Sequence, residues 1–293
     1  MPELPEVETV CRGLQKLIIG DTICDAKVLR SDSIGYPDPA KFASKIRGHK
    51  IERVYRRGKY ILIDLDRAAG MAVHLRMSGR LMVVDKKAPP ERFLRVRMSL
   101  ASGRDLRFED MRVFGRIWYV PPGKTFEQII PSLAELGAEP LEKLTGKSLG
   151  EVLRGKKQPI KSALMDQRVL AGIGNIYADE ALFGSRIHPL RQAGDLRDHE
   201  LDELAKVIRS VLESAIERRG TTLRDYVDAD GVNGNYQHSA WVYGREGEPC
   251  RVCGLQIERT KIGGRSSHFC VECQPARYRK GAAVVITKTT RKK

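Results

Sequence analysis

The sequence predicts an α+β protein of two domains, in which a β-sandwich with one N-terminal helix precedes a helical domain that ends in a four-cysteine module. Three observations support this prediction: an apolar pattern typical of strands over residues 22–120, a helical period after about residue 148, and two C-x-x-C pairs near the end. The chain has 293 residues, and at roughly 100–200 residues per domain this is enough for two domains and a small module.

The first domain is expected to begin with a helix and to continue in strands. Apolar residues recur at helical spacing within residues 6–18. Apolar and polar side chains alternate in residues 94–100, as in a half-buried strand, and residues 105–109 return after a turn. Residues 60–65 and 72–74 are further strand candidates. The pattern predicts a sandwich or flattened barrel with the helix packed on it.

In the second half of the chain, the spacing of apolar residues changes from that of strands to that of helices. Residues 124–148 predict a short helix and a link, and the apolar stripe within residues 201–215 predicts a long helix. Residues 221–240 are polar and predict a long loop, whereas residues 280–293 carry five basic and no acidic residues and predict a flexible tail. The predicted boundaries are 1–131 for the sandwich, 132–244 for the helical domain with its loop at 221–240, 245–279 for the cysteine module and 280–293 for the tail.

The net charge indicates the kind of partner. Fifty-two Lys and Arg against 37 Asp and Glu give a formal charge of +15, so a polyanion is expected to bind. No basic amphipathic helix with an aromatic face is present, which favours nucleic acid over a membrane surface. The N-terminus lacks the basic and apolar regions of a signal peptide, and we expect a cytoplasmic protein.

Four of the six cysteines form two C-x-x-C pairs, Cys250 with Cys253 and Cys270 with Cys273. This spacing is a strong signature of a closed tetrahedral site, and it predicts one structural Zn²⁺ that stabilises a small hairpin. Unrelated pairs, disulfides or an iron–sulfur cluster are the alternatives. The other two cysteines, Cys11 and Cys24, lack metal-like spacing and are expected to be ordinary thiols in the core or on the surface.

The N-terminus holds a candidate nucleophile. Removal of Met1 would leave Pro2 with a free secondary amine, which has a lower pKa than a lysine side chain. Such an amine can attack a carbonyl carbon or a sugar C1′ and form an iminium. The neighbouring Glu3 and Glu6 could relay protons. A helix-capping role for Pro5 and Glu6 would also explain most of this pattern.

Five further segments form an ordered series of motifs. They are PELPEVETV at residues 2–10, RGKY at 57–60, HLRMSG at 74–79, DMRVFG at 110–115 and GIGNIYA at 172–178. Together with the cysteine module, this series resembles the bacterial formamidopyrimidine-DNA glycosylases over residues 2 to about 276. Leu4 favours this branch over the sister family of endonuclease VIII, which begins PEGPE.

The resemblance implies a bifunctional DNA glycosylase and abasic-site lyase with a helix–two-turn–helix motif in its helical domain. By this resemblance, the catalytic residues are Pro2 as the nucleophile, Glu3 as the proton donor, Lys59 as the lysine that assists elimination and Arg265 as the arginine of the last elimination step. The residues that would hold DNA include Arg112, Lys157 and Asn175. A wedge of Met77, Arg112 and Phe114 would fill the hole left by an extruded base, and the loop 221–240 would close over that base.

One departure from the family pattern concerns a DNA contact. The family often has a Lys-His pair before the strand at 94–100, and that histidine touches the DNA backbone. Here Phe93 stands near the expected histidine and cannot bind phosphate. Arg92 or Arg95 could make the contact instead, since arginine binds phosphate well.

The leading hypothesis is therefore a base-excision repair enzyme that removes oxidised purines, namely 8-oxoguanine and formamidopyrimidines, and then cleaves the strand by β,δ-elimination. It would act as a monomer on damaged double-stranded DNA, with no membrane partner. An endonuclease VIII-like glycosylase for oxidised pyrimidines is one alternative. A non-catalytic zinc-finger protein that binds distorted DNA is another, but it would not explain Pro2, Glu3 and Lys59.

Overall fold

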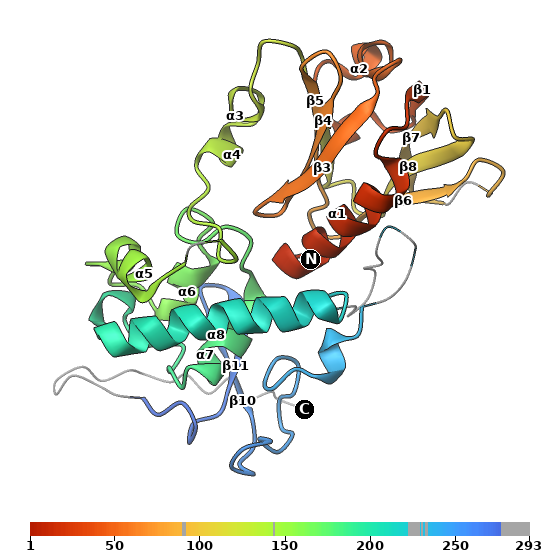
Figure 1. Ribbon diagram of the computed structural model, residues 1–293. Coiled ribbons are helices and arrows are strands. Elements are labelled where there is room, and N and C mark those ends of the chain that lie inside the picture. Colours follow the sequence, from red (N-terminus) through yellow and green to blue (C-terminus); the bar gives the residue numbers. More distant parts are fainter. Residues whose placement is uncertain (90–91, 143, 222–228, 230, 232–233, 277–293) are drawn as a thin grey trace. The chain divides into compact units, whose positions relative to one another are not determined.

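The computed structural model describes the chain except for residues 90–91, 143, 222–228, 230, 232–233 and 277–293 (Figure 1). The chain divides into two compact units, and the division falls within a long helix, α8 (Asp198–Glu217). The first unit comprises residues 1–139 with 212–238, and the second comprises 140–211 with the residues from 239 onward. Among the described residues, no helix has the length and apolar character that a membrane span requires.

The first unit is a β-sandwich of two sheets. One sheet has the strand order β1 (Ile23–Val28), β7 (Leu94–Leu100), β8 (Arg104–Asp110) and β6 (Gly79–Asp85). The other has the order β2 (Ile34–Tyr36), β9 (Arg116–Val120), β5 (Ala69–His74), β4 (Tyr60–Leu65) and β3 (Ile51–Arg57). All strand pairs are antiparallel except β2 with β9.

One apolar core joins the two sheets with the helices α1 (Leu4–Ile18) and α2 (Pro39–Ile46). Its fully buried side chains include Leu14 of α1, Ile63 of β4 and Phe108 of β8. Removing such side chains from water is the main stabilising contribution to a fold of this kind. The predicted sandwich with its N-terminal helix is confirmed, and the predicted strands 60–65 and 94–100 coincide with β4 and β7.

Helix α2 was not predicted from the sequence. It is short, and only Phe42 and Ile46 of its side chains are buried, so its apolar pattern is too brief to identify. Its start is fixed by Asp38, whose Oδ1 accepts a hydrogen bond from the backbone N–H of Ala40 at 2.9 Å. Two further short helices, α3 (Phe126–Ile129) and α4 (Pro131–Ala134), follow the last strand of the sandwich.

The second unit is helical and carries the cysteine module. Its helices before α8 are α5 (Gly146–Leu153), α6 (Ile160–Met165) and α7 (Asn175–Gly184). The module contains a hairpin of β10 (Glu258–Ile262) and β11 (Arg265–Phe269). Gly263 and Gly264, which join these strands, have positive φ values of 55° and 78°, as a two-residue hairpin turn requires. The mixed α and β character of the prediction is confirmed.

Candidate active site

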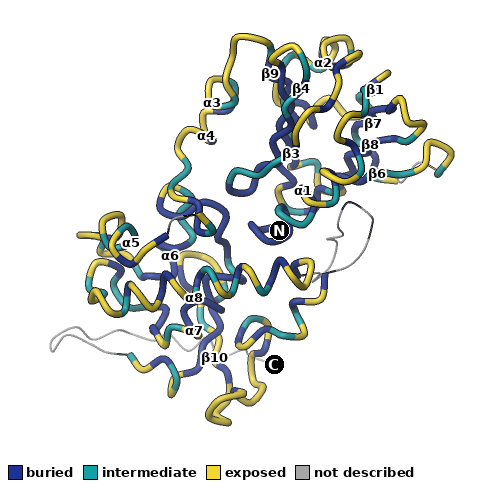
Figure 2. The backbone as a smooth tube through the Cα atoms, in the orientation of Figure 1, coloured by how far each residue is buried: buried dark blue, intermediate teal, exposed yellow. Residues whose placement is uncertain are grey.

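The start of the chain is buried, although Met1 itself is 47 % exposed. Figure 2 shows this buried segment at the label N. Glu6 Oε2 accepts a hydrogen bond from the backbone N–H of Glu3 at 2.8 Å, and its Oε1 accepts one from the N–H of Thr221 at 2.8 Å. Gly220 leaves room for this carboxylate, because a Cβ there would lie 2.7 Å from Glu6 Oε1. Glu6 therefore fixes the backbone next to Pro2.

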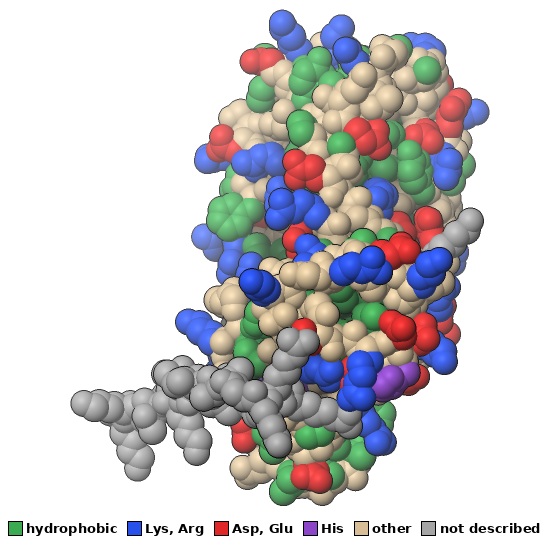
Figure 3. All heavy atoms as spheres, turned by 90° about the vertical axis from the view of Figure 1, so that its left-hand side faces the viewer, with side chains coloured by type: hydrophobic (Ala, Val, Ile, Leu, Met, Phe, Trp, Pro, Cys, Tyr) green, Lys and Arg blue, Asp and Glu red, His purple; other side chains and the backbone are tan. Residues whose placement is uncertain are grey.

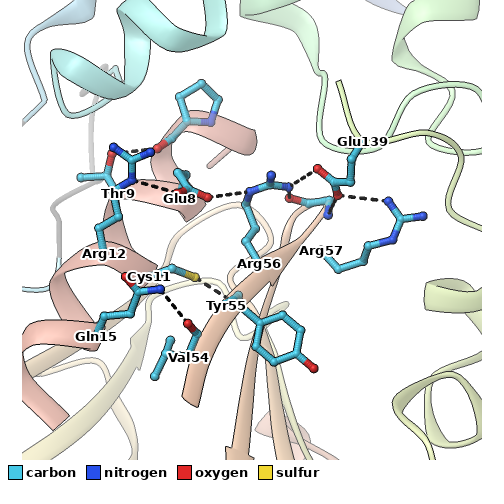
Figure 4. A network of polar contacts seen from close by, with 12 residues as sticks. Glu8, Thr9, Cys11, Arg12, Gln15, Val54, Tyr55, Arg56, Arg57 and Glu139 are labelled. Carbon is cyan, nitrogen blue, oxygen red and sulfur yellow. Dashed lines mark hydrogen bonds and ion pairs between the residues drawn. The ribbon is translucent and has the colours of Figure 1, made fainter. Parts of the chain in front are cut away.

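Two side-chain hydrogen bonds join α1 to β3, the strand that precedes Lys59. Gln15 Nε2 donates to the carbonyl of Val54 at 2.8 Å, and further along the strand Arg56 Nε donates to Glu8 Oε2 at 3.1 Å (Figure 4). As β3 advances, its contacts move toward the helix start. The turn that follows β3 carries Lys59, which is only 7 % exposed. The sequence-predicted Lys59 and Glu3 are thus both buried residues of the same unit.

The turn before Lys59 is held by Glu139, a residue that the sequence analysis missed. The Glu139 carboxylate accepts a hydrogen bond from the backbone N–H of Gly58 at 2.6 Å. It also pairs with Arg56 at 2.7 Å and with Arg57 at 3.1 Å (Figure 4). No local pattern links Glu139 to a turn about eighty residues earlier, so only the folded structure identifies it.

His74, the first residue of the HLRMSG motif, is a second buried group that the sequence did not single out. Burial, together with the charges of Arg76 and Lys59, lowers the pKa of His74 to about 3. Its Nδ1 accepts a hydrogen bond from the backbone N–H of Arg76 at 3.0 Å, and Arg76 has a positive φ of 53°. The imidazole therefore stays neutral beside Lys59. Its hydrogen bond stabilises the left-handed backbone conformation of Arg76 in the loop that follows β5.

This neutral histidine predicts a dependence of stability on pH. The unfolded chain takes up a proton near pH 6.5, but folded His74 does not until about pH 3, so the free energy of unfolding falls as the pH drops below about 6.5. Between pH 7 and pH 5 the expected loss is about 2 kcal/mol. His74→Asn keeps an acceptor near the position of Nδ1 and should remove most of this slope, as measured by urea unfolding at several pH values. An unchanged slope in the variant would contradict the assignment.

The three predicted wedge residues lie on two neighbouring loops of the sandwich. Met77 lies between β5 and β6 and is partly buried, whereas Arg112 and Phe114 lie between β8 and β9 and are exposed. Phe114 is 56 % exposed, and Met111 of the same loop is 45 % exposed although the sequence analysis did not include it. Two exposed apolar side chains on one short loop are a feature typical of a binding surface.

Arg95 is the second residue of β7 and lies next to Phe93, which stands near the family's histidine position. Its Nε donates to the backbone carbonyl of Asp110 at 2.7 Å, and its guanidinium lies 5.8 Å from the ring centre of Phe93. The guanidinium of Arg92 lies 5.4 Å from the same ring, and Arg92 is exposed. The Phe93 ring thus has two arginine side chains close to it at the start of β7. The contact of these arginines with phosphate stays a prediction.

In the second unit, Asn175 is the first residue of α7. Its Oδ1 is buried and has no hydrogen-bond partner among the described residues. The preceding turn is held by Gln167, whose Oε1 accepts from the N–H of Gly172 at 2.9 Å and whose Nε2 donates to the carbonyl of Ile173 at 2.7 Å. Gly172 has a φ of +90°, whereas Gly174 is extended, so only the first glycine of the motif needs its conformational freedom. The predicted Lys157 is exposed between α5 and α6.

The same helix anchors the hairpin of the cysteine module. Asp179, fully buried, pairs with Lys161 at 2.7 Å and accepts hydrogen bonds from Ser267 Oγ at 3.0 Å and from the N–H of His268 at 2.9 Å. Both of these donors lie on β11, which begins with the exposed Arg265. One helix therefore begins with Asn175 and also fixes the strand that carries Arg265.

The neighbouring Glu180 orders the segment that leads into the module. Its carboxylate accepts three backbone N–H groups, those of Trp241, Val242 and Tyr243, at 2.8–2.9 Å. Burial raises the pKa of Glu180 in spite of these donors. A fully buried carboxylate with three donors is a structural anchor, because each donor would be costly to leave unpaired.

The four module cysteines are arranged as a metal site. Their sulfur atoms all lie within 4.8 Å of one another, with 3.8 Å between Cys250 and Cys273 and 3.4 Å between Cys253 and Cys270. Tetrahedral zinc with bonds of about 2.3 Å requires sulfur atoms about 3.8 Å apart, so the site fits Zn²⁺. It is the one such cluster in the described part of the chain.

The other two cysteines lie apart from this site, as expected. Cys11 is buried in the sandwich core, and its burial raises the pKa of the thiol. Cys24 is exposed.

Basic side chains are widespread on the surface. On the face drawn in Figure 3, Lys and Arg side chains are spread over the whole view and alternate with acidic ones. Basic side chains thus occur at many separate positions on this face and form no single patch that would locate the DNA contacts.

Comparison with known proteins gives consistent matches along the chain. Residues 1–117 match the formamidopyrimidine-DNA glycosylase N-terminal domain, residues 136–227 the formamidopyrimidine-DNA glycosylase H2TH domain, and residues 247–276 the zinc finger found in FPG and IleRS. The formamidopyrimidine-DNA glycosylase of Gloeobacter violaceus is 52 % identical over 279 residues, which cover 94 % of this chain and 98 % of that protein.

Solved structures of similar proteins contain DNA. A Lactococcus lactis FPG mutant in complex with Fapy-dG-containing DNA is 33 % identical, with a TM-score of 0.86, and the match covers 94 % of this chain and all of that one. Wild-type L. lactis FPG in complex with DNA containing an oxidised pyrimidine is 33 % identical, with a TM-score of 0.85 and the same coverage.

Proposed function

Because the chain belongs to the formamidopyrimidine-DNA glycosylase family, and is thus a DNA glycosylase and abasic-site lyase of base excision repair, we propose that it removes oxidised purines from duplex DNA. Its substrates are 8-oxoguanine and formamidopyrimidines. The observation that supports this proposal is the buried start of the chain, where Glu6 fixes Glu3 beside Pro2, together with the buried Lys59 of the same unit.

The chemistry follows from these groups. After removal of Met1, the amine of Pro2 attacks C1′, the glycosidic bond breaks, and Glu3 supplies a proton for the departing base. The nitrogen of Pro2 loses its proton, and its lone pair forms the C1′ iminium as the bond from C1′ to O4′ breaks. Glu3 protonates O4′, which opens the sugar ring. Loss of a C2′ proton breaks the bond from C3′ to its phosphate, and a second elimination breaks the bond from C5′ to its phosphate. Lys59 and Arg265 assist these eliminations.

The zinc finger has a supporting part in this scheme. Zinc bound by four thiolates leaves no ligand position open, so its chemistry is structural. It stabilises the hairpin that presents Arg265, and Asp179 fixes the same hairpin to α7.

Borohydride trapping tests the proposed chemistry. Incubation with duplex DNA containing 8-oxoguanine should give a covalent adduct at residue 2 after reduction, together with base release. A non-catalytic DNA-binding protein would bind the same duplex without an adduct or released base, and that outcome would overturn the proposal.

Oxidised pyrimidines are the second candidate substrate class, because an FPG of similar structure has been crystallised with such DNA. Parallel single-turnover assays on 8-oxoguanine and thymine glycol separate the two. We propose faster release of 8-oxoguanine, since Leu4 matches the formamidopyrimidine branch. We also propose that the enzyme acts as a monomer on damaged double-stranded DNA in the cytoplasm.

Two residues of the second unit should differ in the salt dependence of binding. If Lys157 neutralises a phosphate, Lys157→Ala should lower the affinity for damaged and undamaged duplex alike. The slope of log affinity against log salt concentration should become shallower by about 1. Asn175→Ala removes a neutral group, so affinity should fall while the slope stays unchanged. Titrations between about 50 and 200 mM salt measure both quantities.

The control for this comparison is Lys147→Ala, since Lys147 is an exposed lysine of α5 outside the proposed contacts. Its slope and affinity should match those of the wild type. Equal slopes for Lys157→Ala and the wild type would rule out the phosphate contact.

A further inference from the structure

Two loops cross between the sheets at the same end of the sandwich. Residues 75–78 lead from β5 to β6, and residues 111–115 lead from β8 back to β9. Their ends are paired across strands, with Gly79 opposite Asp110 in one sheet and His74 opposite Arg116 in the other. The two loops that carry Met77 and Phe114 are therefore neighbours.

A single buried carboxylate joins these loops. Asp110 is fully buried, and its Oδ1 accepts hydrogen bonds from Ser78 Oγ at 2.5 Å and from the N–H of Arg112 at 3.1 Å. Its Oδ2 accepts from the N–H of Gly115 at 2.7 Å. Ser78, 7 % exposed, also accepts from the N–H of Arg112 at 3.1 Å. The carboxylate thus closes the second loop on itself and ties it to the first.

The conformation that results is an uncommon one. Val113 has a φ of +58°, in the left-handed region that a β-branched residue rarely adopts. Arg116 supports it from the other side, because its Nη1 donates to the carbonyls of Val113 and Gly115 at 2.9 Å each. Gly115 is required for close approach, since a Cβ there would lie 2.5 Å from Phe108. In this conformation Phe114 points its ring into solvent and is 56 % exposed.

We propose that Asp110 and Ser78 are positioning residues, which hold the base-extruding wedge in its inserting conformation before DNA binds. This inference rests on the proposed function, in which Phe114 and its neighbours replace an extruded base. A wedge loop that is already ordered loses little conformational entropy when it enters the duplex. Base extrusion is then more favourable by the entropy cost that is avoided. A loop without the clamp would let the exposed ring fold back onto apolar surface.

A matched control lies at the other end of β8. Ser99 Oγ donates to the fully buried carboxylate of Asp105 at 2.9 Å, and Ser99 is 8 % exposed. This pair joins β7 to β8 as Ser78 and Asp110 join their loops, but it supports no exposed aromatic ring. A merely structural role predicts the same phenotype for Ser78→Ala and Ser99→Ala.

The test compares these variants on two substrates under single-turnover conditions. Ser78→Ala should slow base release from paired 8-oxoguanine about tenfold, the size expected for one buried hydrogen bond, and should leave cleavage of an abasic duplex within about twofold. Ser99→Ala should leave both rates within about twofold while lowering the melting temperature to a similar degree. Equal slowing on both substrates, or the same profile for Ser99→Ala, would overturn the inference.

Two further variants separate failure of the clamp from failure of the wedge. Phe114→Ala should likewise slow base release from paired 8-oxoguanine and spare cleavage of the abasic duplex, which is the preference expected of a wedge residue. If Phe114→Ala shows this preference and Ser78→Ala does not, the clamp is wrong but the wedge stands. If Phe114→Ala shows no such preference, the proposed wedge itself fails. Val113→Gly removes the unfavourable backbone conformation and loosens the loop, so it should fold at least as stably as the wild type yet release paired 8-oxoguanine more slowly. Wild-type rates in Val113→Gly would contradict the need for a fixed loop.

Discussion

Protein that retains Met1 is expected to release damaged base at least about 10³-fold more slowly than the trimmed enzyme under single-turnover conditions, because it lacks the nucleophile. With Met1 attached, the nitrogen of Pro2 belongs to a peptide bond, and its lone pair is delocalised into the carbonyl. It cannot attack C1′. N-terminal mass spectrometry of separated fractions, each assayed for base release and borohydride trapping, measures the effect.

Pro2→Gly tests the role of the Pro2 amine in a second way, in addition to the protein that retains Met1. It should lose base release, but it still offers a primary amine, so some cleavage of abasic DNA should persist. DNA binding should be unchanged, since the substitution removes no charge. An adduct that maps to a lysine such as Lys59, with residue 2 unmodified, would contradict the assignment of the nucleophile.

Loss of a zinc ligand should have the second large effect. Cys250→Ser is expected to unfold the finger and to weaken binding of abasic duplex by at least about 100-fold, because apparent zinc affinities of about 10–16 kcal/mol contribute directly to folding of such modules. The cysteine module buries few apolar side chains, and its Val252, Leu255 and Val271 are exposed. Zinc content and affinity for an abasic duplex are the measurements.

The control for the zinc prediction is Cys24→Ser, since Cys24 is exposed in the other unit and lies outside the metal site. It should keep full zinc content and normal binding. Metal-free protein that binds abasic duplex as tightly as the zinc form would contradict the structural role of zinc.

Local patterns predicted much of this fold. Alternation over 94–100 and the apolar run at 60–65 correspond to whole strands, because side chains on a strand take opposite faces in turn. The helix at 6–18 begins two residues earlier, at Leu4, since Glu6 caps the N–H of Glu3 ahead of the apolar pattern. The spacing of the cysteines likewise predicted their cluster, because metal ligands need fixed separations.

The supporting residues could not be predicted in the same way. Glu139 holds a turn some eighty residues away, and Asp110 binds Ser78 across 32 residues of chain. Such contacts depend on how strands pair, and no period in the sequence encodes them. His74 was visible as part of a motif, but its neutral state follows from burial beside Lys59, which exists only in the folded protein.

The bond between Glu6 and Thr221 joins residues separated by 215 positions, and Gly220 is the neighbour that leaves space for it. Substitutions at position 6 and at positions 220 and 221, just after α8, should therefore not be independent during evolution. A larger side chain at position 220 would displace the carboxylate that orients Glu3, and a shorter acid at position 6 would no longer reach Thr221. Homologous chains are expected to alter these positions together, so that sequence covariation links the two ends of one hydrogen bond.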